Sequence, residues 1–296
     1  MQSTDMMLDV SAVLGATVLG SDQTAQIAAT LHLPDVMPQG ELPLLFAIHG
    51  GGFSRAYWHP AFLDESYSFA RFFTAQGKAV LLIDMLGMGQ SSTPEPESRL
   101  NRELIAAAHA NALQQVMERL GRPVNLTGIG HSMGAMMIVT QAAAHPVFRR
   151  LIVMGWSNEP MQLGDTDVSS LQEGLIPSGY IRSPAGALRK LCYWPDVPQP
   201  LIEALEAHAS ATPACLGRAA LTPGIVHADS ASIGIPVLLV QSAIDTSPAP
   251  DEEPGYFTAA PSVELHKLEE AAHCQNFAGT RQSHWQRLNA WIDRMS

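Results

Sequence analysis

Basic residues are scarce in this chain, and none occurs before Arg55. The 17 lysines and arginines face 28 aspartates and glutamates, which gives a formal net charge of −11. Such a balance argues against nucleic acid or an anionic membrane surface as a partner, because both attract basic patches. A secretory signal needs a basic start, so none is predicted. No run reaches the roughly 18 apolar residues of a membrane span. We therefore expect a soluble, cytoplasmic protein.

Cysteine is also rare, with only Cys192, Cys215 and Cys274 and no CxxC spacing. This set predicts neither a disulfide framework nor a zinc site, and we expect reduced thiols. Charged residues make up only 15% of the 296 positions, whereas 46% are hydrophobic. That composition suits one large α/β domain with an inserted subdomain.

Continuous apolar stretches alternate with helical patterns along most of the chain. The predicted buried strands are residues 42–48, 79–84, 124–130, 151–156, 235–241 and 263–268. Strands this apolar, separated by helices, are typical of a parallel sheet covered on both faces. Residues 11–20 and 26–35 have a strand-like composition and predict an antiparallel hairpin ahead of that sheet.

The alternation stops near residue 158 and resumes near residue 234. Residues 159–233 contain several proline-punctuated helical pieces and no convincing strand. We therefore predict a core formed by residues 1–158 and 234–296, with a helical cap over 159–233 inserted after the sixth strand.

A serine lies between two glycines where a strand pattern turns into a helix pattern, in Gly130-His131-Ser132-Met133-Gly134. A G-x-S-x-G in this setting indicates a nucleophile elbow. Glycines let strand and helix approach closely on both sides of the strained serine. The alternative is a chance match in a glycine-rich turn.

A nucleophilic serine needs donors for the oxyanion that forms when it attacks a carbonyl. His49-Gly50-Gly51-Gly52-Phe53 follows a buried strand, where such a loop belongs. We expect the amides of Gly51 and Gly52, with that of Met133, to be the donors. A plain flexible turn is the alternative. His49 itself is expected to form structural hydrogen bonds.

The serine also needs a base. His273 comes directly after the last predicted strand and is the strongest candidate among 11 histidines. His131 is expected to be buried against the elbow, and His266 lies within a strand. His284 opens the terminal helix, which would carry it away from the site.

An acid is needed to orient that base. Asp245 lies in a turn-rich segment after the seventh strand, where its carboxylate can hold the histidine in the right tautomer. Glu159, just after the sixth strand, is the rival acid. The run Asp251-Glu252-Glu253 is expected to be solvated surface.

Ser132, Asp245 and His273 occur in this order along the chain, after the oxyanion loop at 49–53 and a D-x-x-G-x-G-x-S stretch at 84–91. Over nearly its whole length the chain resembles the α/β-hydrolase fold superfamily, in its serine esterase and lactonase branch with a helical cap. The resemblance implies an eight-stranded, mostly parallel sheet flanked by helices. It also implies no catalytic role for the 84–91 stretch, which resembles a structural feature near the rim of the active site.

Two details place the chain within that superfamily. The oxyanion loop resembles that of hormone-sensitive-lipase-like esterases, but these usually have aspartate where this chain has His131. The elbow is closer to that of general esterases, lactonases and thioesterases. A serine nucleophile argues against the dehalogenase and epoxide hydrolase branches, which have aspartate there.

These patterns predict a serine hydrolase that cleaves an ester or lactone of a fairly apolar small molecule, without metal or organic cofactor. The predicted pocket residues are Phe53, Tyr57, Trp58 and Trp194, with packing in the core as the alternative. A thioesterase, an amidase, a carbon–carbon bond hydrolase, an acyltransferase and a non-enzymatic ligand receptor remain open. Substrate identity and oligomeric state, including a homodimer, also remain open.

Overall fold

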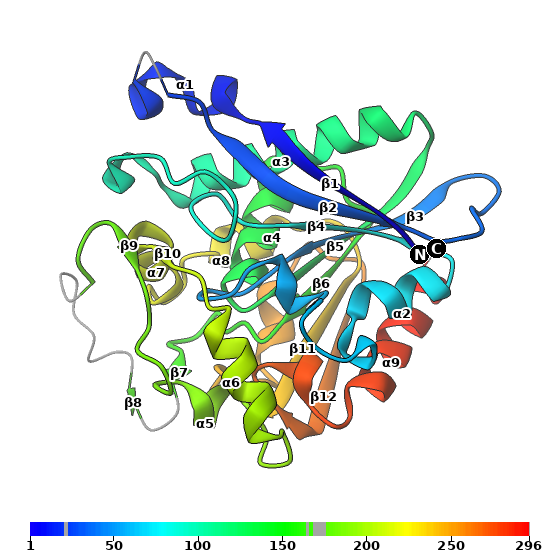
Figure 1. Cartoon of the computed structure of the whole chain (residues 1–296). Coiled ribbons are helices and arrows are strands. Elements are labelled where there is room, and N and C mark those ends of the chain that lie inside the picture. The colour runs from blue at the N-terminus through cyan, green and yellow to red at the C-terminus, as the bar shows by residue number, and fades with distance from the viewer. Residues whose placement is uncertain (21–22, 164–165, 168–175, 296) are drawn as a thin grey trace.

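The computed structural model describes residues 1–20, 23–163, 166–167 and 176–295. Its centre is an eight-stranded sheet with the order β1-β2-β4-β3-β5-β6-β11-β12 (Figure 1). The strands are β1 Gln2–Asp9, β2 Gln26–Leu33, β3 Leu42–Ile48, β4 Ala79–Ile83, β5 Val124–His131, β6 Arg150–Met154, β11 Val237–Ile244 and β12 Val263–Ala272.

The sheet is parallel from β4 to β12, as the apolar strand patterns predict. Strand β2 pairs antiparallel with both β1 and β4, so β2 runs against the rest of the sheet. Every residue of β4 and β6 is buried, because helices cover both faces of the sheet.

Helices form one layer on each side of the sheet. Helices α3 (Arg102–Leu120) and α4 (Met133–Ala144) contact each other on one face. Helices α2 (Phe69–Ala75) and α9 (Arg281–Arg294) contact each other on the opposite face (Figure 1). Two hydrophobic cores result, one on each side of the sheet.

The expected strand at 11–20 is wrong. These residues form α1 (Ser11–Leu19), which is kinked at Gly15 and buries Leu14, Val18 and Leu19. The spacing of Leu14 and Val18 is helical, and α1 packs against α3. The antiparallel pair does exist, but β1 supplies it. Only one residue of β1 is buried, so this edge strand has little apolar signal.

The stretch between β6 and β11 has more strand than expected. Its helices are α5 (Arg189–Cys192), α6 (Gln199–Ala207), α7 (Ala214–Ala220) and α8 (His227–Ser232). Two short antiparallel pairs accompany them, β7 (Gln162–Leu163) with β8 (Thr166–Asp167) and β9 (Tyr180–Ile181) with β10 (Thr212–Pro213). Strands of two residues are too short to show a period in the sequence.

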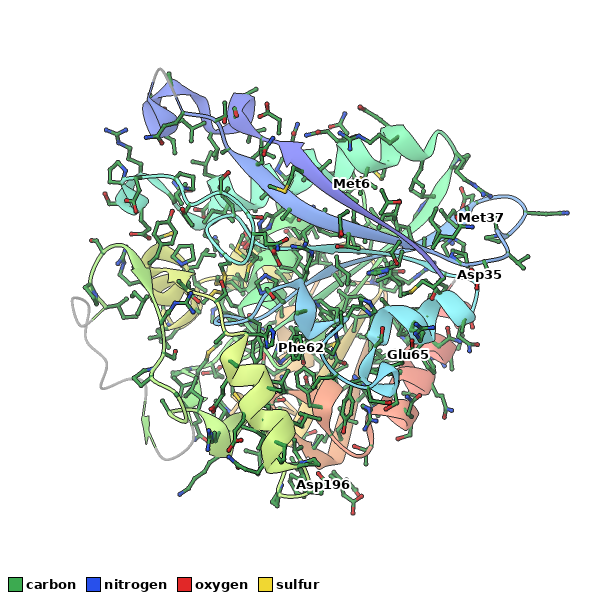
Figure 2. All side chains as sticks on the ribbon, viewed as in Figure 1. Met6, Asp35, Met37, Phe62, Glu65 and Asp196 are labelled. Carbon is green, nitrogen blue, oxygen red and sulfur yellow. The ribbon has the colours of Figure 1, made fainter. Side chains whose placement is uncertain are left out.

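The predicted cap boundaries of 159 and 233 enclose residues 164–165 and 168–175, which lie outside the described residues. Helices α7 and α8 contact α4, whereas α5, α6 and β7 to β10 lie beside the ends of the strands (Figure 1). Phe62, which is labelled in Figure 2, stacks on His208 at the end of α6, with 3.7 Å between ring centroids. None of the helices within the described ranges is apolar over the length that crossing a membrane requires.

Candidate active site

All the candidate catalytic residues follow the carboxyl ends of parallel strands. The oxyanion loop follows β3, Ser132 follows β5, Asp245 follows β11 and His273 follows β12. Because these strands run in the same direction, their carboxyl ends share one edge of the sheet. Ligands of open α/β sheets bind outside that edge.

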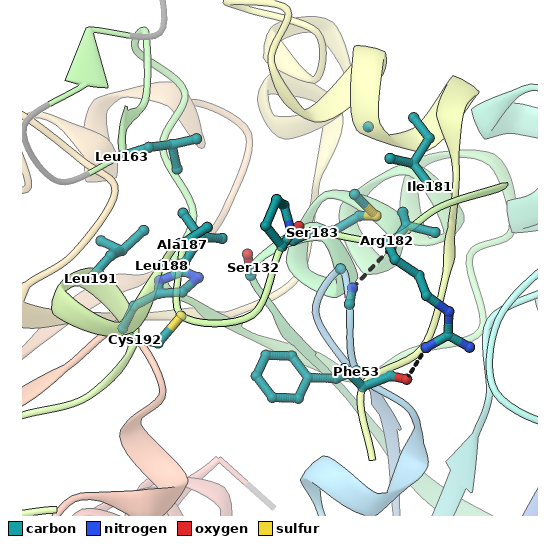
Figure 3. A pocket seen from close by; sticks show the side chains of 18 of the residues that line it. Phe53, Ser132, Leu163, Ile181, Arg182, Ser183, Ala187, Leu188, Leu191 and Cys192 are labelled. Atoms are coloured by element: carbon teal, nitrogen blue, oxygen red, sulfur yellow. Dashed lines mark hydrogen bonds between the residues drawn. The ribbon is translucent and has the colours of Figure 1, made fainter. Parts of the chain in front are cut away.

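Ser132 has a strained backbone, with φ 56° and ψ −124°. Among the described residues it is the only non-glycine residue with a positive φ. Its own amide donates to the Met154 carbonyl at 2.8 Å, which fixes the turn between β5 and α4. The Ser132 side chain is half-buried and faces a cavity (Figure 3). Backbone strain at a serine that faces a cavity is typical of a functional position.

The two glycines of the elbow are required by close backbone contacts. A Cβ on Gly130 would overlap the Gly134 carbonyl, and a Cβ on Gly134 would overlap the carbonyls of Ile48 and His49. Backbone atoms cannot move aside as the end of a flexible side chain can. Strand β5, helix α4 and the end of β3 therefore approach one another only because both positions lack side chains.

We expect Gly130→Ala to lower the free energy of unfolding by about 3 kcal/mol or more, because the added methyl overlaps backbone atoms. Urea denaturation followed by circular dichroism measures this. Gly234→Ala is the matched control, because a Cβ there meets nothing within 4 Å. Equal stability of the two variants would contradict this account of the elbow.

His273 and Asp245 form a hydrogen-bonded pair beside the elbow. The His273 Nδ1–H donates to Asp245 Oδ1 at 2.7 Å. Both side chains are almost fully buried, at 7% and 3% exposure. His273 and Ser132 line the same cavity. With Nδ1 holding the proton, Nε2 is the ring nitrogen that can accept one.

The pKa of His273 is shifted by opposing effects. Burial disfavours the imidazolium and lowers the pKa, but the charge of Asp245 and its hydrogen bond raise it, and the net pKa lies above the usual histidine value. His273 therefore remains a proton acceptor only above that raised pKa.

Several groups that the sequence analysis missed hold this pair. The Asp245 carboxylate also accepts the amides of Ser242 and Thr246, each at 2.8 Å, and the Gln275 side-chain amide at 3.2 Å. Gly155, with φ 60°, lies so close to the pair that a Cβ would be 2.9 Å from His273 Nδ1. Only the position of Gln275, two residues after the candidate base, could have drawn attention to it.

The rival candidates for the acid and the base make their contacts away from Ser132. Glu159 accepts a short hydrogen bond from the Tyr256 hydroxyl. His284 is buried in α9 and stacks on His266. Glu253, expected as solvated surface, is only 2% exposed and accepts hydrogen bonds from the Asn158 amide and side chain. That expectation is wrong, because Glu253 ties the exit of β6 to the loop that follows β11.

The oxyanion loop lies against the elbow. A Cβ on Gly50 would be 3.1 Å from Ser132 Cβ, and one on Gly51 would be 3.0 Å from Met133 Cε. Within the described part of the chain, the amides of Gly51 and Met133 have no bonded acceptor. Both residues line the cavity. Their N–H groups are thus free to bind an oxyanion.

The prediction for Gly52 needs correction. Gly52 lines the cavity, but its amide donates to the Thr212 hydroxyl at 2.9 Å. The Ser210 amide in turn donates to the Gly52 carbonyl at 2.8 Å. Gly52 therefore attaches the oxyanion loop to the segment before α7, and its amide is occupied. His49 is buried and accepts the Met85 amide at 3.1 Å, which confirms its structural role.

A cavity of about 480 Å³ opens above Ser132 (Figure 3). Its apolar wall comes from the oxyanion loop and from the stretch between β6 and α7. Its larger apolar side chains include Phe53, Met133, Met161, Leu163, Ile176, Ile181, Leu188, Leu191, Leu205 and Leu221. The ion pair Arg189–Glu206 also lines it. The size and lining suit a small apolar ligand.

Of the predicted pocket residues, Phe53 lines this cavity and the other three do not. Tyr57 and Trp58 are 1% and 0% exposed and belong to the core on the α2 and α9 side. Trp194 packs on the same core. Tyr57 stacks on the His131 ring at 4.3 Å between centroids, and His131 Nε2 donates to the His273 carbonyl at 2.8 Å. Tyr57 thus supports the site from behind.

The 84–91 stretch forms a buried polar turn. The Asp84 carboxylate accepts hydrogen bonds from the Arg55 guanidinium, from the Arg55 amide at 2.6 Å and from the Gln90 amide at 2.8 Å. Gly89, with φ 56°, has no room for a side chain because Asp84 lies against it. This network connects the segment after the oxyanion loop to the end of β4. In the part of the chain described, no group of three or more histidine, cysteine or acidic side chains is placed to hold a metal.

Comparison with known proteins gives one family and several distant structures. A model described as "Alpha/beta hydrolase family" matches residues 44–290. No curated protein matches the sequence. Similar solved structures include Est1E from Butyrivibrio proteoclasticus with bound ferulic acid, at 16% identity, 98% coverage of each chain and a TM-score of 0.63.

Two further structures show the same fold. A thermophilic esterase from Thermogutta terrifontis, with malate bound, has 16% identity, covers 100% of this chain and 99% of its own, and has a TM-score of 0.64. A proline iminopeptidase from Mycobacterium smegmatis has 17% identity, covers 92% of this chain and 95% of its own, and has a TM-score of 0.63. At these identities the likeness extends to the fold and no further.

Proposed function

This chain belongs to the alpha/beta hydrolase family, and we propose that it is a serine hydrolase that cleaves a carboxylic ester or lactone of a fairly apolar small molecule. The observation that carries the proposal is one cavity lined by both Ser132 and His273, with His273 hydrogen-bonded to Asp245 behind it. A strained serine, a base and an orienting acid are the set that covalent acyl transfer needs.

The proposed reaction begins when Ser132 Oγ attacks the acyl carbonyl and His273 Nε2 takes the hydroxyl proton. The amides of Gly51 and Met133 bind the oxyanion. His273 then protonates the leaving alcohol and afterwards activates the water that hydrolyses the acyl-enzyme. Asp245 keeps the imidazole in the Nδ1–H tautomer and stabilises the imidazolium in both steps.

The apolar wall of the cavity supports a substrate with a hydrophobic acyl or alcohol group. Ferulic acid, bound to the similar Est1E structure, is an aromatic acid of a size that a 480 Å³ cavity can hold. The mechanism needs no metal or organic cofactor. A cap over residues 159–233 and a cytoplasmic location remain predictions from the sequence.

The proposal is tested with a fluorophosphonate and a substrate panel. We expect the reagent to modify Ser132 alone, as mapped by peptide mass spectrometry, and to stop the turnover of p-nitrophenyl esters. Matched ester, thioester and anilide substrates of one acyl group separate the esterase from a thioesterase or an amidase. Modification of another residue, or full ester turnover after complete labelling of Ser132, would overturn the assignment.

A further inference from the structure

Two of the three cysteines lie next to each other beside the site, and one of them, Cys192, lines its cavity. Cys192 ends α5 and is 8% exposed, and Cys274 follows His273 and is 2% exposed. The Cys274 amide donates to the Cys192 carbonyl at 2.9 Å, and the His273 amide donates to the Leu191 carbonyl at 3.0 Å. These two consecutive hydrogen bonds attach the loop of the candidate base to α5.

The distance between the two backbones at this pair allows a disulfide. Standard bond lengths and the 2.9 Å hydrogen bond limit the separation of the Cα atoms of Cys192 and Cys274 to about 6.8 Å. Disulfides span Cα separations of about 4.4–6.8 Å. The two thiols also lie within reach of a hydrogen bond to each other. A cross-link therefore needs little movement of the backbone.

Access and reactivity both favour Cys192 as the first thiol to react. Cys192 lines the cavity above Ser132, so a small oxidant can reach it (Figure 3). The hydrogen bond from the Cys274 thiol lowers the pKa of Cys192 against the opposing effect of burial, and the nearby His273 lowers it further. Burial raises the pKa of Cys274 well above its usual value. A thiol with a lowered pKa beside a second thiol is the arrangement of a peroxide-sensitive pair.

We propose that Cys192 and Cys274 are a redox modification site, at which hydrogen peroxide forms a reversible disulfide that slows catalysis. The Cys192 thiolate attacks one peroxide oxygen, the O–O bond breaks, and a sulfenic acid and hydroxide form. The Cys274 thiol then attacks the Cys192 sulfur, the S–O bond breaks, and the hydroxide leaves as water with the thiol proton. The two thiols lose two electrons in total, and the peroxide becomes two waters.

The disulfide would act on His273 through its backbone. An S–S bond of about 2.05 Å is much shorter than a hydrogen bond between thiols, so the small adjustment of the loop and α5 that the cross-link does need falls on the residue next to His273. His273 precedes Cys274 in the same loop, and its amide donates a hydrogen bond to the Leu191 carbonyl of α5. Misplacement of a reacting group by about 1 Å can cost a hundredfold in rate. We expect the oxidised protein to turn over esters at least about tenfold more slowly.

The test is peroxide treatment of the whole chain, followed by alkylation of free thiols and peptide mapping without reduction. We expect a cross-linked pair of peptides containing Cys192 and Cys274, with the mass of two hydrogens lost, and recovery of turnover with dithiothreitol. Cys215→Ser is the matched control, because burial and the adjacent Glu97 raise the pKa of Cys215 to about 12. This variant should still form the cross-link.

Cys192→Ser and Cys274→Ser should each turn over the ester at the same rate before and after peroxide treatment. The Tm of each untreated variant is measured first and should equal that of the wild-type protein, so that a loss of fold is not mistaken for a loss of the cross-link. A sulfinic acid at either cysteine without the cross-link would overturn the proposal, as would two thiols that stay reduced. A complete cross-link with unchanged turnover would overturn its regulatory part. Because the cross-link is read by mass, this result is independent of the proposed esterase function.

Discussion

Replacement of Ser132 by alanine is expected to lower kcat for ester hydrolysis by about 10⁴- to 10⁶-fold. The reason is that the strained elbow presents the Ser132 hydroxyl to the cavity that the candidate base His273 also lines. Without it the acyl group has no protein nucleophile, and only the oxyanion donors and the cavity remain. Rates with a p-nitrophenyl ester, measured at saturating substrate, give kcat directly.

Two measurements separate lost chemistry from lost fold in this variant. The alanine variant should keep its Tm and still bind a slowly hydrolysed ester, because the cavity wall is unchanged. Ser283→Ala, an exposed position on α9, is the control and should retain full turnover. If the Ser132 variant turned over the ester within tenfold of the wild-type protein, Ser132 could not be the nucleophile.

Replacement of Asp245 by asparagine is expected to lower kcat/KM by about 10⁴-fold at neutral pH. A neutral asparagine accepts a hydrogen bond from the Nδ1–H of His273 less strongly than a carboxylate does. Its amide N–H can also donate to Nδ1, which favours the tautomer with the proton on Nε2. The variant keeps nearly the same shape, so the loss reports on charge and tautomer. Initial rates over pH 4.5 to 9 provide the measurement.

The pH dependence of kcat/KM tests the role of Asp245 in a second, independent way. His273 must be unprotonated to act as a base, so kcat/KM falls as the pH drops through its pKa. Asp245 raises that pKa in the wild-type protein, against the effect of burial. Removing the carboxylate should therefore move the acidic limb to lower pH while the plateau drops.

Glu159→Gln is the matched control, because Glu159 bonds to Tyr256 and was the rival acid in the sequence. It should leave both the plateau and the acidic limb near those of the wild-type protein. An acidic limb that moves with Glu159 and not with Asp245 would reverse the assignment.

Much of this architecture could be predicted from the sequence because it depends on neighbours along the chain. Buried strands such as β4 are apolar throughout, and Gly121 ends α3 in the left-handed conformation that favours glycine. The segment at 11–19 was wrongly predicted as a strand because alanine, valine, leucine and glycine occur in both strands and helices. Its packing against α3 favours the helix. Edge strand β1 escaped notice because it buries almost nothing.

The alternation of strands and helices, the elbow around Ser132, and the order of the loops that hold Asp245 and His273 could all be predicted from the residues alone. Each of these follows from spacing and residue type over a few positions. The folded chain was needed to show that Phe53 lines the cavity while Tyr57 and Trp58 fill the core, and that the Thr212 hydroxyl accepts the Gly52 amide. A cavity wall is made where distant segments meet, and no local pattern records which side of an aromatic ring will face solvent.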